Sequence, residues 1–438
     1  MNKSPFDSLP KLSQLEAITI LKTPLENLER SSDYYKAAFH LSKYPGKESE
    51  EALITLLESD LMDDSIRLAK RKAIDSLVKL KCNRSLSLIE KFLWSDDIYL
   101  VESAAWAAME LGSDKENVVS RLSTLLFDTN QNRRMLVQSL SRLGGNYGLA
   151  AIKILLNSSS LDVGVKGACM AAMSRVKHDH KYYPELRKHL FLPNQNDRHC
   201  AVQDVIDAKA FELLPDAIRS PISPSFRLRA VESLVPDDSH NSNINLLSNF
   251  DRIILDDPRQ IYLGDTSIED YSFDQIFSTD FRVAYRALNY LIVQEAEDIW
   301  DAFLPYKKRL ELDYGAMYFA MILFRMVSGW NDSAMEYIKD LAFNCLSDYW
   351  PNNMKFRPAA IIFLMSLDPY IYINSLEKWL DEESNPYWVT RYAVLLGSQL
   401  NPNDSTSILI RNKLTTINSD SNRFVRLKVL SIIDNSNS

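Results

Sequence analysis

The sequence predicts an all-α fold, a right-handed solenoid of helix pairs that forms a curved superhelix, with an irregular insertion near the middle of the chain. Two observations predict it. Apolar residues recur at spacings of three and four in one segment after another, which is typical of helices with a single buried face. Only 11 glycines occur in 438 residues, and this scarcity disfavours folds built on glycine-rich turns.

The first repeat unit is predicted between Asp33 and Asp60. Two helical patterns flank a break at Pro45-Gly46, so the segment reads as a helical hairpin. The apolar faces consist of Tyr35, Ala38, Phe39 and Ser42 in the first helix and Ala52, Leu53, Leu56 and Leu57 in the second. The small alanines of the first helix would let neighbouring helices approach closely.

The same unit returns every ~30 to 35 residues, which is short for a HEAT repeat but consistent with a solenoid of HEAT-like helix pairs. First helices are marked by Ala69/Ala73/Leu77, Val101/Ala105/Ala108, Leu136/Leu140/Leu143, Val165/Ala168/Ala172, Ala201/Val205/Ala208 and Ala230/Leu234. The pattern lapses between Val235 and Thr279 into a polar stretch. Such a long interruption is typical of a spacer or of a functional loop.

Regular helices are predicted again after the interruption, and they are richer in aromatic residues. Their expected ranges are Arg282–Gln294, Tyr314–Val327, Ser333–Leu346, Arg357–Leu367, Tyr372–Leu380 and Thr390–Leu400. We therefore divide the chain into N-terminal HEAT-like repeats (1–235), an irregular insertion (236–279) and C-terminal aromatic-rich helical repeats (280–438).

Composition and motifs exclude several classes of function. The formal charge of −8 provides no basic field for nucleic acid. No apolar run approaches the roughly 20 residues that span a bilayer. The four cysteines lack CxxC spacing, which indicates reduced thiols in a cytoplasmic protein. Phosphate-loop, dinucleotide and zinc-protease motifs are absent. The segment His178-Asp179-His180 offers fewer ligands than the three or four that a zinc site needs. We expect neither a metal nor a cofactor of the protein's own.

Three segments carry a resemblance to a known family. Tyr34-Tyr35-Lys36-Ala37-Ala38-Phe39-His40-Leu41 looks like a signature of the E/F-type phycobilin lyases, which are HEAT-repeat proteins. The signature departs at Phe39 and His40, which replace the usual tryptophans. The segments Tyr387–Leu396 and Asp280–Leu288 are similar to the long single-chain members that serve phycoerythrin α-subunits.

The resemblance implies a lyase that forms a carbon–sulfur bond in phycobilisome assembly. Its substrate would be phycoerythrobilin, a linear tetrapyrrole, and its partner an apo phycoerythrin α-subunit. A cysteine of the subunit would form a thioether with the vinylidene carbon of ring A. Close relatives also isomerise the pigment to phycourobilin, so a lyase-isomerase remains an alternative. A non-catalytic HEAT-repeat scaffold or chaperone remains an alternative of another class, because the fold alone permits it.

A tetrapyrrole site needs aromatic walls, cations for two propionates and a group that handles protons. We predict Asp313 and Tyr318 as the proton-handling pair. Candidate substrate-binding residues are Arg282, Tyr285, Arg286, Tyr290, Tyr314, Arg325, Arg391, Trp106, Arg198 and His199. The aromatic residues would otherwise belong to the core, whereas a buried arginine demands an anionic partner.

Overall fold

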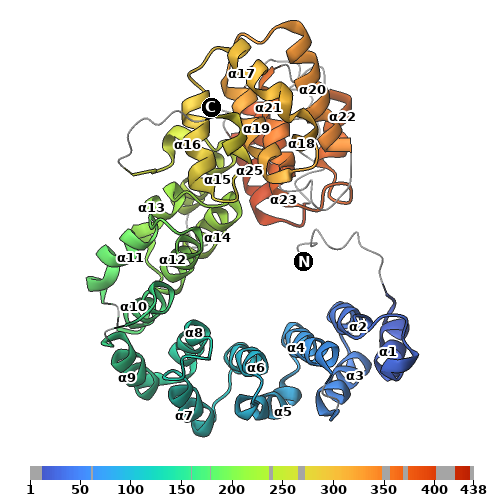
Figure 1. Ribbon diagram of the computed structural model, residues 1–438, viewed down its shortest axis with the longest axis vertical. Coiled ribbons are helices and arrows are strands. Elements are labelled where there is room, and N and C mark those ends of the chain that lie inside the picture. The colour runs from blue at the N-terminus through green and yellow to red at the C-terminus, as the bar shows by residue number, and fades with distance from the viewer. Residues whose placement is uncertain are drawn as a thin grey trace. The chain divides into compact units, whose positions relative to one another are not determined.

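The computed structural model describes residues 12–60, 63–158, 160–177, 179–235, 240–264, 272–347, 356–367, 373–400 and 420–434. Over these ranges the secondary structure is helical and no strand occurs, which confirms the all-α prediction. The chain divides into two compact units (Figure 1). The N-terminal unit comprises Pro10–Leu186 with Asp207–Lys209, and the C-terminal unit comprises Arg187–Ile206 with Ala210–Ser438.

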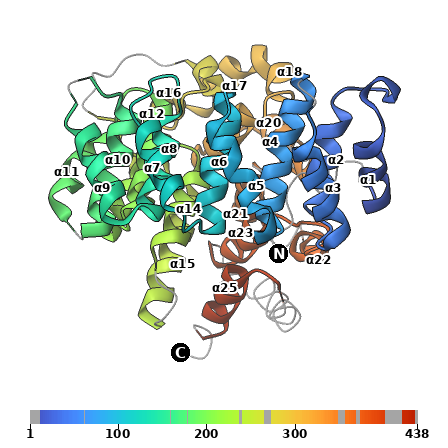
Figure 2. The same ribbon diagram turned by 90° about the horizontal axis from the view of Figure 1, so that it is seen from below.

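The N-terminal unit contains ten α-helices among the described residues. They are α1 (Gln14–Lys22), α2 (Asp33–Leu41), α3 (Lys47–Glu58), α4 (Asp64–Lys79), α5 (Leu86–Lys91), α6 (Ile98–Leu111), α7 (Glu116–Leu125), α8 (Arg133–Leu143), α9 (Gly145–Leu156) and α10 (Val163–Lys177). The first helices of successive pairs, α2, α4, α6, α8 and α10, pack one against the next (Figure 2). The unit is therefore a solenoid of helix pairs, as predicted.

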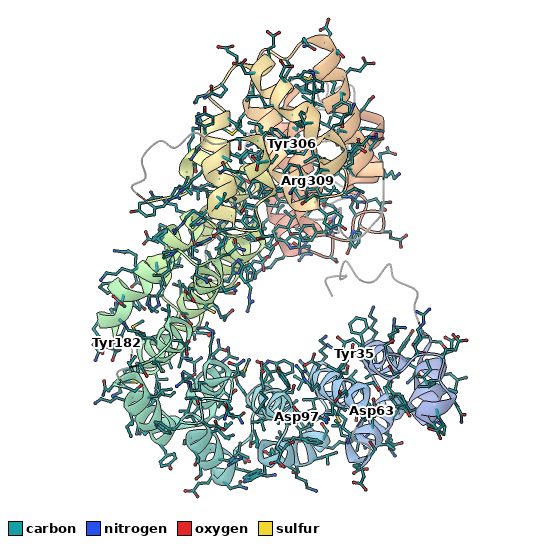
Figure 3. All side chains as sticks on the ribbon, in the orientation of Figure 1. Tyr35, Asp63, Asp97, Tyr182, Tyr306 and Arg309 are labelled. Atoms are coloured by element: carbon teal, nitrogen blue, oxygen red, sulfur yellow. The ribbon has the colours of Figure 1, made fainter. Side chains whose placement is uncertain are left out.

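Small side chains allow this stacking. Ala38, Ala73 and Ala105 are completely buried in α2, α4 and α6, where the sequence pattern placed them. Aspartates fix the helix starts, because a carboxylate at the cap position satisfies otherwise unpaired N–H groups. Asp63 accepts a hydrogen bond from the Ser65 amide, and Asp97 accepts from the Tyr99 amide (Figure 3).

The C-terminal unit begins within α11 and repeats the same architecture. Its helices are α11 (Tyr183–His189), α12 (Gln195–Asp207), α13 (Leu214–Arg219), α14 (Pro224–Leu234), α15 (His240–Leu255), α16 (Phe281–Leu291), α17 (Ala296–Phe303), α18 (Lys307–Leu310), α19 (Tyr314–Met326), α20 (Asp332–Ser347), α21 (Arg357–Leu367), α22 (Ile373–Leu380), α23 (Trp388–Leu400) and α25 (Arg423–Asp434). Helices α16, α19, α21, α23 and α25 stack in succession. Helix α15 packs across α21, α23 and α25.

Short 3-10 helices join or extend the α-helices of both units. They are η2 (Leu25–Asn27), η3 (Asn83–Ser85), η4 (Phe92–Trp94), η5 (His180–Tyr182), η6 (Phe211–Leu213), η7 (Pro258–Gln260), η8 (Phe273–Phe277) and η9 (Leu304–Tyr306).

The stretch 236–279 is not irregular throughout, and this part of the prediction is wrong for His240–Leu255, which form α15. Asn, Ser and Asp are weak helix formers, so the segment looked like a loop. Its helix is stabilised by a buried apolar face that includes Phe250 and Ile253. The division of the chain into two compact units falls between residues 187 and 210, whereas the sequence pattern placed it at 235.

The described residues provide neither a membrane-spanning helix nor a cluster of metal ligands. No described helix is both long and apolar enough to cross a membrane. Within the same ranges, no three His, Cys, Asp or Glu side chains converge as metal ligands would. His178 lies outside the described residues.

Candidate functional site

An aromatic pocket with a cavity volume of ≈ 340 Å³ lies in the C-terminal unit. It is formed by α14, the end of α15, the starts of α16, α19 and α21, and the segment that enters α23. The aromatic side chains that line it are Phe226, Phe281, Tyr314, Tyr318 and Tyr387. Aromatic walls with a few hydroxyl groups suit a flat, conjugated ligand of limited polarity. We refer to this cavity as the aromatic pocket.

A buried carboxylate stands behind one wall of the aromatic pocket. Asp256 follows the last residue of α15 in the left-handed region, with φ of 44°, and is 2% exposed. Its carboxylate accepts hydrogen bonds from the Tyr285 hydroxyl at 2.5 Å and from the Tyr318 hydroxyl. Arg227 forms an ion pair with the same carboxylate at 2.9 Å and donates to the Tyr285 oxygen at 2.6 Å. Side chains from α14, α16 and α19 therefore meet at Asp256.

The electrostatics of this cluster keep both tyrosines protonated. Burial raises the pKa of Tyr285 and of Tyr318 well above the usual value, and the Asp256 charge adds to the effect. Burial alone would lower the pKa of Arg227, but the ion pair with Asp256 outweighs it and the pKa is raised. Arg227 thus stays charged and compensates Asp256.

Tyr318 is the member of the cluster that reaches the aromatic pocket. Its proton is directed at Asp256, so its oxygen keeps lone pairs with which it can accept a hydrogen bond from a ligand N–H group. A hydroxyl with a strongly raised pKa is a poor proton source. The arrangement therefore favours Tyr318 as a positioning group and hydrogen-bond acceptor.

Asp313, the other half of the predicted proton-handling pair, has a different set of partners. It is the N-cap of α19, and its carboxylate accepts from the Gly315 and Ala316 amides, each at 3.0 Å. Gly315 and Tyr314 line the aromatic pocket, so Asp313 lies at its margin. The structure thus joins Tyr318 to Asp256, while Asp313 holds the start of the helix.

Two of the predicted substrate-binding arginines are closed to a ligand, and we correct their assignment. Arg198 is completely buried and donates to the Pro221, Leu192 and Pro193 carbonyls as well as to Asp280. Arg391 is 1% exposed and forms a bidentate ion pair with Asp420 at 2.7 and 2.8 Å. Each arginine was expected to need an anionic partner, and the chain itself supplies it.

Three further candidates on α16 lie outside the aromatic pocket. Arg282 donates to the Leu192 carbonyl at 3.0 Å, and Arg286 donates to the Leu263 carbonyl at 3.0 Å. Both arginines are half-buried and join α16 to preceding segments of the chain. Tyr290 is also half-buried and lines neither this pocket nor the second cavity described below.

The remaining candidates occupy three different surroundings. His199 stacks on Phe226, a lining residue, with ring centroids 4.3 Å apart, so it lies one layer behind the wall of the aromatic pocket. Arg325 lines a second, larger cavity of the same unit. Trp106 belongs to α6 of the N-terminal unit and packs against the core of that unit. Of the predicted residues, the structure brings together Tyr314, Tyr318 and Tyr285.

Comparisons with known proteins bear on the family. No family model matches the chain. The bilin biosynthesis protein CpeY of Synechococcus sp. (strain WH8020) is 29% identical over 393 residues, which cover 88% of this chain and 93% of that protein. The uncharacterized phycocyanin operon protein Y of Pseudanabaena tenuis (strain PCC 7409) is 28% identical over 425 residues, 93% of this chain and 98% of that protein.

These alignments run through both units, over almost the full length of each relative. This chain is similar over most of its length to a bilin biosynthesis protein and to a phycocyanin operon protein. Among solved structures, a chain of the complex of CpcE and CpcF of phycocyanin lyase from Nostoc sp. PCC7120 matches 58% of this chain, and the match covers 99% of that chain. The sequence identity is 21% and the TM-score is 0.47.

The family segments recognised in the sequence fall on first helices of repeat units. Tyr34–Leu41 lie on α2, Asp280–Leu288 start α16, and Tyr387–Leu396 start α23. The last two segments each contribute to the aromatic pocket, through Phe281 and Tyr387.

Sequence reasoning missed Asp256, Arg227, Phe226 and Tyr387 as members of the site. Asp256 lay in the stretch taken as irregular. The sequence did contain a signal for α14, because its Phe226-Arg227 pair recurs as Phe281-Arg282 at the start of α16. Burial raises the pKa of Tyr387 to about 12, so it too presents a neutral hydroxyl to the pocket.

Proposed function

We propose that this chain is a phycobilin lyase that attaches phycoerythrobilin through a thioether bond to a cysteine of a phycoerythrin α-subunit in the cytoplasm. The observation that carries the proposal is the aromatic pocket, whose wall contains a tyrosine fixed by a buried carboxylate. The names of the relatives support it, since one is a bilin biosynthesis protein and the other belongs to a phycocyanin operon. The pigment enters as substrate, and the lyase needs no cofactor of its own.

The chemistry of a linear tetrapyrrole matches the aromatic pocket. Its conjugated rings would stack on walls such as Phe226 and Phe281, and a pyrrole N–H would donate to the Tyr318 oxygen. The cavity of ≈ 340 Å³ lies near the lower end of the usual range for small-molecule sites, so we propose that it takes only part of the pigment. The reacting ring A would then remain accessible to a second protein.

The thiol comes from the partner in this scheme. The sulfur of the subunit cysteine bonds to the vinylidene carbon of ring A, and the tetrapyrrole gains one proton. The lyase itself supplies orientation and excludes water, which raises the effective concentration of the two reactants. This agrees with the four cysteines of the chain, which form no disulfide bond and none of which lines the aromatic pocket.

Co-expression tests the proposal. The full chain is produced with phycoerythrobilin and an apo phycoerythrin α-subunit, and the subunit is examined by denaturing electrophoresis and by mass analysis of its pigmented peptide. A covalent adduct with the absorbance of phycoerythrobilin is the expected product. A blue-shifted phycourobilin adduct would instead favour the lyase-isomerase. A subunit that stays colourless would overturn the lyase proposal and leave a scaffold or chaperone.

A further inference from the structure

A second cavity in the C-terminal unit, with a volume of ≈ 730 Å³, has three arginines among the seven described residues that line it. It lies between the last turn of α15, η7 and the end of α19. These arginines are Arg252, Arg259 and Arg325, and Asp257 is the only acidic residue among the lining residues that the structure describes. We refer to this cavity as the arginine pocket.

Arg325 is anchored so that its charge remains unpaired. Its guanidinium donates to the Leu255 carbonyl, the last residue of α15. Burial lowers the pKa of Arg325, although the neighbouring Tyr318, Asp256 and Asp257 act in the opposite direction. Among the described residues, Arg325 forms no ion pair with a carboxylate.

Arg252, which lines the arginine pocket from α15, also lacks an acidic partner of its own among the described residues. Its Nε donates to the Gln260 side-chain oxygen at 2.5 Å, which is a neutral partner. Burial and the nearby charges of Arg219 and Arg227 lower its pKa. A partly buried guanidinium near other guanidinium groups is unfavourable unless an anion compensates it.

Arg259 stands at the rim and has its own counter-ion. Its side chain is 67% exposed and pairs with Asp257 at 2.6 Å, and Asp257 also caps η7. The described lining residues thus carry three positive charges from arginines and one negative charge from Asp257, which leaves a net charge of +2. The unpaired ones belong to the two more buried residues, Arg252 and Arg325.

The arginine pocket is separate from the aromatic pocket. The last turn of α15 lies between them, because Ile253 and Ile254 line the aromatic pocket while Arg252 and Leu255 line the arginine pocket. Likewise Tyr318 and Arg325 lie two turns apart on α19. A ligand in the arginine pocket therefore need not displace one in the aromatic pocket.

We propose that the arginine pocket is an oxyanion-binding site in which Arg252 and Arg325 hold a ligand with carboxylate or phosphate groups. Guanidinium groups bind both kinds of oxyanion in bidentate geometry. The oxyanion has two sources. One is the pair of propionates of a linear tetrapyrrole, which rests on the proposed function. The other is free or organic phosphate, which does not.

The experiment uses the full-length chain, its Arg252→Gln variant and, as a matched control, Arg309→Gln. Arg309, labelled in Figure 3, is an arginine of the same unit. It packs over the Phe277 ring at 4.1 Å and lines neither pocket. Arg252→Gln is preferred to a change at Arg325 because Arg325 also holds the end of α15. Calorimetric titration with inorganic phosphate forms the first arm. Absorbance titration with biliverdin and with its dimethyl ester forms the second.

Binding of phosphate that weakens about tenfold or more in Arg252→Gln, but not in Arg309→Gln, supports the site with phosphate as its source. A preference for biliverdin over its ester that disappears in Arg252→Gln supports the site with propionates as its source. The proposal is overturned if the wild-type chain shows neither effect, or if Arg309→Gln changes binding as much as Arg252→Gln. Neither arm involves attachment, so a colourless subunit in the co-expression test would leave the phosphate result standing.

Discussion

Tyr318 shows at the scale of one residue how burial decides chemistry. The side chain lines the aromatic pocket, yet its hydroxyl proton is committed to Asp256 and its pKa is raised. A group in this state orients a ligand better than it delivers a proton. Its contribution to attachment should therefore depend on the oxygen atom and not on titration.

Tyr318→Phe is expected to slow attachment about tenfold, because the variant keeps the ring but loses the acceptor for a pyrrole N–H. The fold should survive with a loss of about 1 kcal/mol, since Asp256 keeps Tyr285 and Arg227 as partners. Initial rates of pigment attachment measure the first effect, and urea unfolding measures the loss of stability. The matched control is Tyr337→Phe, which removes a hydroxyl that donates to Glu311 at 3.3 Å and that lies outside the aromatic pocket. Equal rates in the two variants would remove Tyr318 from the site.

His199 provides a pH-dependent test of the layer behind the aromatic pocket. Burial, with the Arg198 charge, lowers its pKa from 6.5, so the folded chain favours the neutral ring. The unfolded chain binds the proton first as pH falls below about 6.5, and the free energy of unfolding then decreases until the lowered pKa is reached. His199→Phe should flatten this decrease, because the ring stacks on Phe226 and its Nε2 has no hydrogen-bond partner in the described chain.

Urea unfolding at several pH values between 7 and about 5 measures this effect. His40→Phe serves as the control, since burial also lowers the pKa of His40 but that residue lies in the N-terminal unit. An unchanged slope in His199→Phe for transitions of the C-terminal unit would contradict the assignment.

The sequence predicted which residue types build the site better than it predicted their partners. Periodicity placed Tyr314 and Tyr318 on one helix, and in the structure both residues line the aromatic pocket. The same reasoning required an anion for each inward arginine but could not say which one. Asp420 lies 29 positions from Arg391, and Asp280 lies 82 positions from Arg198. Pairings at such separations depend on the stacking of repeats, which local patterns do not encode.

Helix α15 organises the C-terminal unit at the scale of an element. It carries Asp251 and is followed at once by Asp256, and each carboxylate bonds side chains from distant helices. Asp251 accepts from the Tyr392 hydroxyl at 2.7 Å and from Lys428 at 2.8 Å, across more than 140 residues of sequence. The helix is therefore held to α23 and α25 by polar contacts as well as by its apolar face.

Asp251→Asn is expected to lower the free energy of unfolding by about 3 kcal/mol, because Lys428 is 2% exposed and would keep a buried charge without its counter-ion. Tyr392 retains the Leu247 carbonyl as an acceptor at 3.3 Å. Burial already lowers the pKa of Lys428. The loss should therefore shrink as pH rises and the lysine of the folded variant sheds its proton.

Urea unfolding at neutral pH measures the loss of stability, and urea unfolding at alkaline pH tests whether this loss becomes smaller. The double variant Asp251→Leu, Lys428→Met should recover most of the lost stability, since apolar groups of similar size replace both charges. If Asp251→Asn unfolded like the wild type, α15 would not depend on this ion pair.

Elements with strong apolar periodicity were predicted to within a few residues, and α15 shows why one was not. The expected helix Arg357–Leu367 coincides with α21, whose residues are almost all buried. In α15 the apolar face is interrupted by Asn, Ser and Asp, which favour turns when they lack tertiary partners. Here Asp251 has such partners in α23 and α25, so long-range contacts outweigh local propensity.

The whole molecule consists of two compact units, each with a core of its own. In the N-terminal unit Leu140 is completely buried on α8. In the C-terminal unit α21 and α23 approach closely at Gly397, where an added Cβ atom would come within 2.7 Å of the Met365 Cβ atom. In repeat proteins, stability is a sum of local terms and contacts between neighbouring repeats. Damage to one core should therefore stay within its unit.

We expect Leu140→Ala to cost about 2–5 kcal/mol through the cavity it creates, and Gly397→Ala to cost about 1–3 kcal/mol through overpacking. Amide hydrogen exchange followed by mass spectrometry locates each loss. Leu140→Ala should speed exchange in α6, α8 and α10 while α21 and α23 keep their protection, and Gly397→Ala should do the reverse. Gly315→Ala, where the nearest atom to an added Cβ is 3.4 Å away, should leave both patterns intact and serves as the control. If either core variant accelerated exchange equally in all of these helices, the two units would unfold as one cooperative body.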